Sequence, residues 1–481
     1  MNFRIIAYIV GWVCNFQAIF MVLPCITALV YQEHEFFAFL ISMILCLIAG
    51  IPLTARKPKN KVFYTKDGCV AVALSWLALC IFGSVPFVLS GSIPHPIDAF
   101  FETVSGFTTT GSSILTDVEV LPHCILMWRS FTHWIGGMGV LVFVLVLTSL
   151  DKKNTMYLMR AEVPGPEKDK LVPKAMATAR ILYGMYFALT AVEIVLLLFG
   201  GMSPFDSIIH AFSTAGTGGF SNYANSIGQL DSAYIDGVIT VFMILFGINF
   251  NLFYLLLLRQ FKPVWKNEEL RTYLAIIATA IALITWNITS LYGNPLKAFR
   301  YAAFQVASII TTTGFSTADY MKWPTMSQTI IIILMIIGAC ASSTGGGIKV
   351  SRFLIVVKSI KKELKQMVHP KSVNLIRING KKMNPDIVQN VFVYLVAYAG
   401  IAGLSVLLVS IDDFDFATNL GSVMGTLNNI GPGLGVSGPA GNFAQFSPFS
   451  KLVFCMDMLI GRLEIFPFLM LFTSISWRKK F

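Results

Sequence analysis

Thr108-Thr109-Thr110-Gly111 is the stretch that decides the fold, because related stretches return three more times along the chain. The third copy is nearly literal, at Thr311-Thr312-Thr313-Gly314, and weaker copies stand at Thr217-Gly218-Gly219 and Asn428-Asn429-Ile430-Gly431. Each copy follows a short apolar run that is rich in Phe, Ala and Ser. Four copies spaced by roughly a hundred residues indicate a fourfold internal repeat.

The register of the second copy follows from its distance to an upstream aspartate. Asp98 and Asp206 each stand thirteen residues before a glycine, Gly111 in the first copy and Gly219 in the second. A serine also stands six residues before the glycine in three copies, at Ser105, Ser213 and Ser308. We therefore align Gly219 with Gly111, although the sequence Ala215–Gly219 departs from Thr-x-Gly and leaves a slipped register as the alternative.

Composition places the chain in a lipid bilayer. Its 481 residues are 55% hydrophobic and 13% charged, the mean hydropathy is +0.70, and many apolar runs exceed eighteen residues. The net charge of +11 does not indicate nucleic acid, because the basic residues lie between apolar runs and not on a soluble face. The eight cysteines are scattered without a Cys-x-x-Cys motif, so they read as small apolar residues.

Ten apolar spans are predicted, and the basic residues concentrate in alternate joins between them. The positive-inside rule then places both termini in the cytoplasm. The expected spans are Ile5–Leu29, Phe36–Leu53, Cys69–Leu89, Ile125–Leu150, Met176–Phe199, Tyr234–Leu258, Leu270–Thr289, Ile330–Ile360, Val388–Val409 and Phe449–Ile475.

Each repeated unit reads as a span, a half-helix too short to cross, a Thr/Gly loop and a second span. Pro94 and Pro96 break the backbone before the first half-helix, and Asp98 is expected to cap it. The predicted fold is an all-α polytopic membrane protein, with four such pseudo-repeats around a central pore and two additional N-terminal transmembrane helices. The domains are residues 1–66 (two additional N-terminal helices), 67–173 (pore repeat 1), 174–266 (pore repeat 2), 267–382 (pore repeat 3, with an interrupted second helix) and 383–481 (pore repeat 4).

The four loops, here called the filter loops, are interpreted as the lining of an ion pore. Irregular backbone at membrane depth is tolerated only where protein buries it or where it lines a wet cavity. Loops that meet on one axis satisfy this condition, and their carbonyl oxygens can replace the hydration shell of an ion. The half-helices enter from outside, so their partly negative C-terminal ends point inward at a cation. Ordinary Thr/Gly connections would explain one copy, but four copies in matching contexts favour the pore.

Two features below the filter loops need an explanation. Gly345-Gly346-Gly347 interrupts the longest apolar run, either as a kink where helices approach closely or as an unwound segment that acts as a gate. A phosphate-binding loop is excluded, because Lys349 is not followed by Ser or Thr and no strand precedes it. Arg462 lies inside the last span, where an unpaired cation costs at least ~2.5 kcal/mol. Its candidate partners are the carbonyl groups of Gly345–Gly347, which we prefer, or one of the acidic residues Glu464, Asp457 and Glu193.

The chain resembles the TrkH-type potassium transporter subunits of the Trk/Ktr/HKT superfamily over essentially its whole length. The two additional N-terminal spans suit the TrkH branch. The motifs that carry the resemblance are Thr108–Gly111, Gly218-Gly219-Phe220-Ser221, Thr312-Thr313-Gly314-Phe315, Leu427–Gly433, Ser342–Gly347 and Gly461-Arg462-Leu463-Glu464.

The resemblance implies a potassium uptake protein of the bacterial inner membrane. In such families a serine at the first filter glycine accompanies sodium selectivity, and this chain has Gly111. Gating is expected from the Gly-rich segment, Gly345, Gly346 and Gly347, together with Arg462. Potassium is then the substrate, and the only metal expected, at the filter residues Thr109, Thr110, Gly111, Gly218, Gly219, Thr313, Gly314, Ile430 and Gly431.

The resemblance also implies partners. These are a second copy of the chain, giving a homodimer with one pore per subunit, and a cytosolic regulatory ring of the TrkA type. NAD(H) or ATP is expected on that ring, and no cofactor is expected on this chain. We expect the basic segments Lys152–Lys174 and Lys358–Lys382 to form the docking face for the ring.

A second class of function stays open, a polytopic membrane enzyme acting on lipid-linked substrates. Such an enzyme should group acidic or His residues in its loops, whereas the special residues here lie in four equivalent backbone loops, and the six histidines show no metal-ligand spacing. Within transport, the sequence does not separate a gated channel from a proton- or sodium-coupled symporter.

The aligned glycines generate a prediction about selectivity. Gly111→Ser or Gly314→Ser should admit sodium, because the added side chain disturbs the ring of carbonyl groups. The measurement is the ratio of rubidium to sodium uptake at matched expression. A ratio equal to that of the parent would show that the filter has been placed wrongly.

Overall fold

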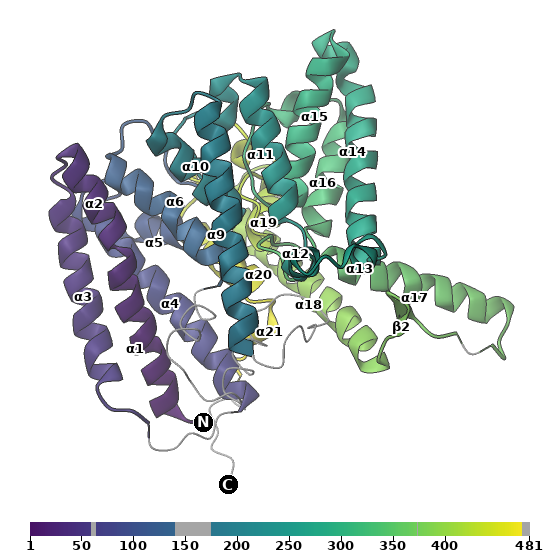
Figure 1. Ribbon diagram of the computed structural model, residues 1–481, viewed down its shortest axis with the longest axis horizontal. Helices are drawn as coiled ribbons and strands as arrows, with labels where there is room; N and C mark the ends of the chain where they lie inside the picture. Colours follow the sequence, from purple (N-terminus) through teal and green to yellow (C-terminus); the bar gives the residue numbers. More distant parts are fainter. Residues whose placement is uncertain (59–63, 140–174, 373, 474–481) are drawn as a thin grey trace.

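The computed structural model describes residues 1–58, 64–139, 175–372 and 374–473, and these are almost entirely helical (Figure 1). The α-helices are α1 (Phe3–Phe20), α2 (Val22–Tyr31), α3 (Phe36–Thr54), α4 (Thr65–Leu89), α5 (Pro96–Phe107), α6 (His123–Gly137), α9 (Ala175–Phe199), α10 (Pro204–Gly216), α11 (Ala233–Phe246), α12 (Phe250–Leu257), α13 (Phe261–Trp265), α14 (Glu268–Tyr292), α15 (Pro295–Ile310), α16 (Thr325–Ile337), α17 (Val350–Val368), α18 (Pro385–Val409), α19 (Phe416–Leu427), α20 (Pro448–Arg462) and α21 (Phe466–Leu469).

Short 3₁₀ turns and one small hairpin complete the described structure. The 3₁₀ turns are η1 (Ser226–Leu230), η2 (Tyr320–Lys322), η3 (Ser410–Asp412) and η4 (Gly435–Ser437). Strands β1 (Arg377–Ile378) and β2 (Lys381–Lys382) pair antiparallel. The predicted docking segment Lys152–Lys174 and the second half of the expected span Ile125–Leu150 lie outside the described residues.

Six helices of the described chain are long and apolar enough to cross a bilayer, and a bent pair could make a seventh. The six are Phe3–Tyr31, Phe36–Thr54, Lys66–Leu89, Arg180–Phe199, Glu268–Tyr292 and Pro385–Asp412. They include the first span of every predicted repeat. The outer helices expose apolar side chains, as α3 does with Ile41, Ile44 and Ile48, which is the expected face toward lipid.

The prediction of uninterrupted second spans is wrong in the second and fourth repeats. The expected span Tyr234–Leu258 bends by 93° between α11 and α12, where the Asn249 side chain caps α12 by accepting from the Asn251 N–H at 2.9 Å. The expected span Phe449–Ile475 breaks after Arg462, where Glu464 and Ile465 both have positive φ. The third repeat is interrupted as predicted, between α16 and α17.

The short helices that lead into the filter loops are α5, α10, α15 and α19, here called the pore helices. Three of them start with proline at the first position, which fixes φ where no N–H bond is needed. The fourth is capped by the Asp415 side chain. Asp98 does not cap α5 as predicted. It lies in the first turn and pairs with Lys451 of α20 at 2.7 Å, which joins the first unit to the fourth.

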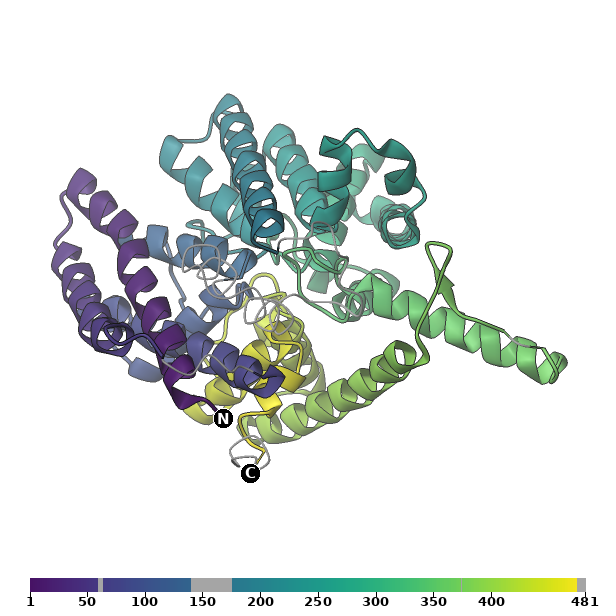
Figure 2. The same cartoon turned by 60° about the horizontal axis from the view of Figure 1, so that its bottom comes forward.

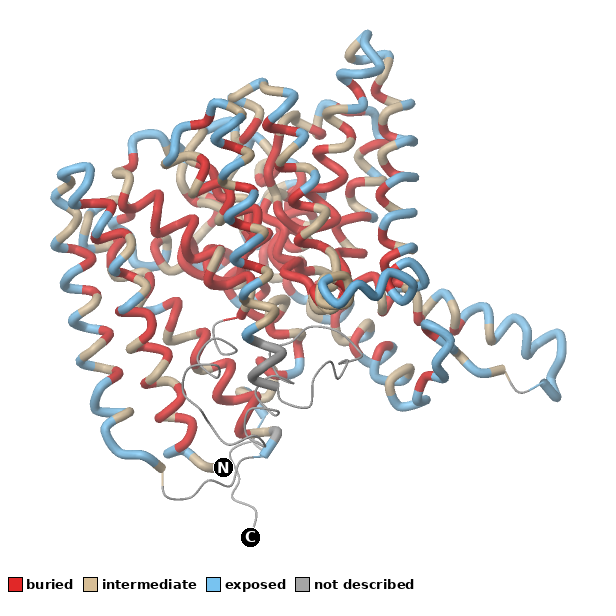
Figure 3. Tube along the Cα trace, in the orientation of Figure 1, coloured by how far each residue is buried: buried red, intermediate tan, exposed pale blue. Residues whose placement is uncertain are grey.

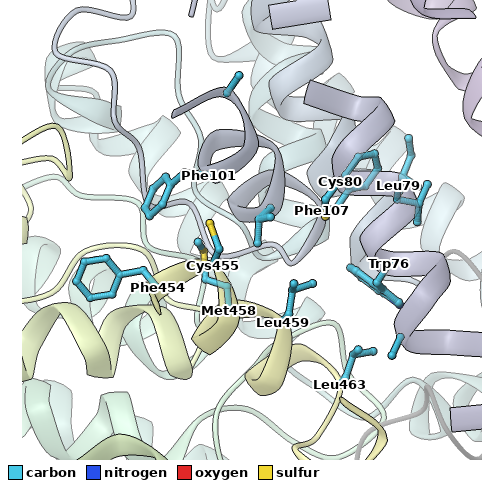
Figure 4. Packing of buried hydrophobic residues seen from close by; sticks show 14 of the residues in the cluster. Trp76, Leu79, Cys80, Phe101, Phe107, Phe454, Cys455, Met458, Leu459 and Leu463 are labelled. Atoms are coloured by element: carbon cyan, nitrogen blue, oxygen red, sulfur yellow. The ribbon is translucent and has the colours of Figure 1, made fainter. Parts of the chain in front are cut away.

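The pore helices and the helices that follow the filter loops form a closed ring. In each unit the helix after the loop packs against the pore helix of the next unit: α6 on α10, α11 on α15, α16 on α19, and α20 on α5. Figure 3 shows that buried residues concentrate in this central region. Figure 4 shows the joint between the fourth and first units, where apolar side chains of α4, α5 and α20 meet: Trp76, Leu79, Cys80, Phe101, Phe107, Phe454, Cys455, Met458 and Leu459.

A carboxylate from the turn between α2 and α3 caps a helix from another part of the chain. The Glu33 oxygens accept from the backbone N–H groups of His123 (2.6 Å) and Cys124 (2.9 Å), at the N-terminus of α6. Partial burial opposes ionisation of Glu33, but these hydrogen bonds outweigh it and hold its pKa below the usual value. The negative charge also matches the positive end of the helix dipole.

Replacing Glu33 should therefore destabilise the protein in a pH-dependent way. Because the folded-state pKa of Glu33 is lowered, its contribution is present above the unfolded pKa of about 4.3 and disappears as pH falls through the folded value. Glu33→Gln should cost up to about 1 kcal/mol near pH 7, after allowance for solvent screening. The measurement is thermal unfolding of the purified protein between about pH 3.5 and 7, a range that spans the titration of Glu33. The exposed carboxylate variant Asp413→Asn is the control, and an equal shift in both variants would contradict this cap.

Candidate functional site

The four filter loops share one backbone conformation. The residue two positions before each filter glycine has φ between 55° and 58°, in the left-handed region: Thr109, Thr217, Thr312 and Asn429. The filter glycines also have positive φ, from 77° to 98°: Gly111, Gly219, Gly314 and Gly431. Repetition of the same unusual conformation four times shows that the loops are equivalent in structure as well as in sequence.

Each loop closes the pore helix before it with the same pair of hydrogen bonds. In the first loop Thr110 N–H donates to the Ser105 carbonyl at 2.9 Å, and Thr109 N–H donates to Gly106 at 3.1 Å. This is the Schellman arrangement, in which a left-handed residue ends the helix. The bond that spans five residues recurs in the other loops. Gly218 N–H donates to the Ser213 carbonyl, Thr313 N–H to Ser308 and Ile430 N–H to Gly425, each at 2.8 Å.

Three of the left-handed residues are threonines, although β-branched residues rarely adopt this conformation. Such a conformation costs of order 1–3 kcal/mol and persists only where surrounding contacts enforce it. Two of them form hydroxyl bonds: Thr312 Oγ1 accepts from Gly346 N–H of the Gly-rich segment at 2.6 Å, and Thr217 Oγ1 donates to the adjacent Gly216 carbonyl at 2.6 Å. In the fourth loop Asn429 donates to Thr110 Oγ1 and to the Met458 carbonyl, both at 2.9 Å.

The loops meet in a closed ring. A Cβ atom added to any filter glycine would collide with the carbonyl oxygen of the residue that precedes the filter glycine of an adjacent loop. The contacts run from Gly111 to Gly218, from Gly219 to Thr313, from Gly314 to Ile430, and from Gly431 to Thr110. All four filter glycines also line one cavity of about 150 Å³. Glycine is therefore required at these positions by the close approach of neighbouring backbones as well as by φ.

The nine residues predicted to bind an ion come together in this ring. Gly219 occupies the glycine position and Gly218 the preceding position, as the alignment through Asp206 predicts. The loops are buried in protein, which satisfies the requirement on irregular backbone at membrane depth.

A buried ion pair that the sequence analysis missed supports the ring on the side of this cavity. Arg129 of α6 and Glu102 of α5 pair at 2.7 Å, with side chains 2% and 0% exposed. Glu102 also accepts from Ile114 N–H at 3.0 Å, beyond the first filter loop, and Arg129 donates to the Ser221 carbonyl at 3.3 Å, beyond the second. The pair thus ties two adjacent loops together. Opposite charges within two short apolar helices were the signal in the sequence.

The Gly-rich segment lies directly against the third and fourth filter loops. Besides the bond to Thr312, Gly347 N–H donates to the Asn428 carbonyl at 3.1 Å. A Cβ on Gly345 would stand 2.7 Å from the Thr311 carbonyl oxygen. The three glycines therefore let the segment pack where side chains would not fit.

The carbonyl groups of this segment bind a lysine that the sequence analysis missed. Lys349 Nζ donates to the carbonyl oxygens of Gly345 and Gly346, and Lys349 is 2% exposed. Arg462 was predicted to hold these carbonyls, but it donates to the preceding one, Thr344, at 2.9 Å. A lysine inside the apolar run was a visible signal, because its burial costs as much as that of Arg462.

Arg462 links the Gly-rich segment to another helix. It also donates to the carbonyl groups of Gly136 and Gly137, at the end of α6. The alternative partner Glu464 pairs with Arg352 in the first turn of α17, and the Arg352 guanidinium lies 3.9 Å from the Tyr394 ring centroid. Two cations and one ion pair therefore surround the interrupted helix below the filter loops.

The chain is similar to known transport proteins over its whole length. The family described as "TrkH: Cation transport protein" matches residues 34–479. Trk system potassium uptake protein TrkH is 38% identical in Salmonella typhimurium and 37% in Escherichia coli, over the full length of both chains. TrkG of Escherichia coli is 32% identical over 99% of each chain. The crystal structure of the potassium transporter TrkH from Vibrio parahaemolyticus superposes with a TM-score of 0.89 at 34% identity, covering 99% of this chain and 100% of that one.

The family match and the likeness to a solved transporter define the class of this chain, a multi-pass helical membrane protein of a cation-transport family. The chain belongs to the TrkH family and is a potassium uptake transporter of the Trk type. The relatives are transport proteins, so the alternative of a lipid-modifying membrane enzyme is not supported.

Proposed function

We propose that potassium crosses this chain through the ring of filter loops, with backbone carbonyl oxygens as its ligands. The observation that carries the proposal is the closed series of contacts between each filter glycine and the carbonyl of an adjacent loop. Oxygens held at fixed positions can replace the hydration shell of an ion of matching size. The hydrogen bonds that close each pore helix hold the loops in shape, and the C-terminal ends of the four helices favour a cation there.

The Gly-rich segment is proposed to gate this path from below. It is pinned to the filter loops by Thr312 and Asn428, while Lys349 and Arg462 hold its carbonyl groups. Each cation both satisfies carbonyl groups that the interrupted helix leaves free and repels potassium electrostatically. Displacement of the segment would remove the obstruction, move the adjoining Lys349 with it and break the contact with Arg462 of α20.

Flux through purified protein in liposomes tests both proposals. Lys349→Met and Arg462→Ala should each raise rubidium uptake several-fold, with ~1 kcal/mol off the barrier giving about a fivefold gain. The double variant should gain less than the product of the single gains, because both cations hold the same segment. Lys297→Met, at an exposed lysine of α15, is the control. No rubidium uptake in any folded variant would refute conduction by this chain alone. Uptake in every variant at the parent's rate would refute the gate.

A channel and a symporter differ in the driving force. In the same liposomes, a reversal potential set by the potassium gradient alone is expected of a channel. A shift of that potential on imposing a proton or sodium gradient is expected of a symporter.

The projecting helix α17 is proposed to bind two protein partners in the cytoplasm (Figure 2). One side exposes apolar residues at coiled-coil spacing: Phe353, Val357, Ile360, Leu364 and Met367. Another side carries Lys361, Lys362 and Lys365. We assign the apolar side to a second copy of the chain and the basic side to an acidic TrkA-type ring that binds NAD(H) or ATP. We also propose that the chain lies in the bacterial inner membrane with both termini in the cytoplasm, as the positive-inside rule favours.

Charge reversal separates the two contacts. Replacing Lys361, Lys362 and Lys365 by Glu should sharply reduce co-purification of a co-expressed TrkA-type ring, and should leave the mass of the detergent-solubilised dimer unchanged. Raised salt should weaken the parent's association in the same way. Association that survives both charge reversal and salt would exclude an electrostatic dock on this helix.

A further inference from the structure

The second filter loop departs from the others, because the residue before its filter glycine is Gly218 and not Thr or Ile. We propose that His133 of α6 is a positioning residue for this loop, and that its ring takes the space a side chain at position 218 would fill. The imidazole thereby fixes the Gly218 carbonyl that faces Gly111 in the ring. This inference rests on the proposed filter and adds a residue that sets its shape.

His133 is fully buried behind the second loop. A Cβ atom built on Gly218 would collide with the ring atoms Nδ1, Cγ and Cε1 of His133. The same ring stacks on Phe220, one residue past the filter glycine, with centroids 4.2 Å apart and planes at 17°. His133 therefore contacts the loop on both sides of Gly219.

The obstruction at Gly218 differs in kind from that at the filter glycines. Gly219 has φ of 77°, and its added Cβ would meet the backbone of Thr313. Gly218 has no such φ, and the nearest obstruction is a side chain. A substitution can remove a side chain but cannot move a neighbouring backbone, so a clash at Gly218 can be relieved.

The other loops do not need such support, because their own side chains anchor the position before the glycine. Thr110 and Thr313 each form a hydroxyl–hydroxyl bond of 2.8 Å with the threonine two residues earlier. Ile430 is fully buried in apolar contacts. Gly218 has no side chain that could form a hydroxyl bond or an apolar contact, and the ring of His133 supplies the missing packing.

Arg129, one turn earlier on the same face of α6, contacts the second filter loop together with His133. Its guanidinium lies 4.1 Å from the centroid of Phe220, which therefore contacts both His133 and Arg129. Residues at i and i+4 on a helix point the same way, so one face of α6 can hold the loop. Since α6 belongs to the preceding unit, the shape of the second filter loop depends on its neighbour.

A double-mutant experiment tests this assignment. The variants are His133→Ala, Gly218→Ala and their combination, with the ratio of rubidium to sodium uptake in liposomes as the readout. Each single variant should lower the ratio about tenfold, and the combination should return it to within about threefold of the parent, because residues in direct contact couple. His133→Ser combined with Gly218→Ala is the second rescue variant, and size-exclusion profiles verify folding.

Gly219→Ala provides the matched control. It should abolish selectivity, and His133→Ala should not restore it, because the obstruction there is backbone. An unchanged ratio for Gly218→Ala, or no rescue by either His133 variant, would overturn the role of His133. If Gly219→Ala itself kept the parent's ratio, the proposed filter would fail instead, so the two failures are distinguishable.

Discussion

The structure depends on one constraint, which is that four segments of non-helical backbone must be held at membrane depth with their carbonyl groups close together. Lipid cannot satisfy free N–H and C=O groups, so protein must surround such segments. Each filter loop meets this demand with two hydrogen bonds back into its pore helix and with a left-handed residue that turns the chain. The glycine that follows then approaches the backbone of an adjacent loop, and the ring closes only because all four units do the same.

Contacts between units keep the ring closed. Every pore helix packs against the second helix of the preceding unit, so no unit forms its part of the ring alone. Charged pairs cross or reinforce these joints: Asp98 with Lys451 between the first and fourth units, and Arg300 with Asp236 between the third and second. At the joint of the first two units, Arg129 holds Glu102 behind the first loop and reaches Ser221 behind the second. Charges buried in this way are costly alone and acceptable when paired.

The broken second helices have a related role below the ring. A helix that unwinds leaves carbonyl groups free, and here Lys349 and Arg462 supply the donors. The two cations therefore follow from the interruption itself, and in the proposed gate they also repel potassium. The ion pair of Arg352 and Glu464 joins α17 to the break after α20, so displacement of α17 would also disturb that break.

The sequence by itself determined the class of fold, the four loops, the register of Gly219 and the interruption at Gly345–Gly347. These rest on local signals: apolar length, repeated Thr and Gly, and fixed spacing from Asp206. Only the tertiary structure decided which donor meets which carbonyl. Arg462 binds Thr344 while Lys349 takes Gly345 and Gly346, and Asp98 pairs with Lys451 instead of capping its helix. The partners of Arg462 and Asp98 lie 118 and 353 residues away, so their choice depends on the packing of whole helices, which no local pattern encodes. Lys349 lies only four residues from Gly345, but which of the two cations binds that carbonyl group again depends on how α20 packs.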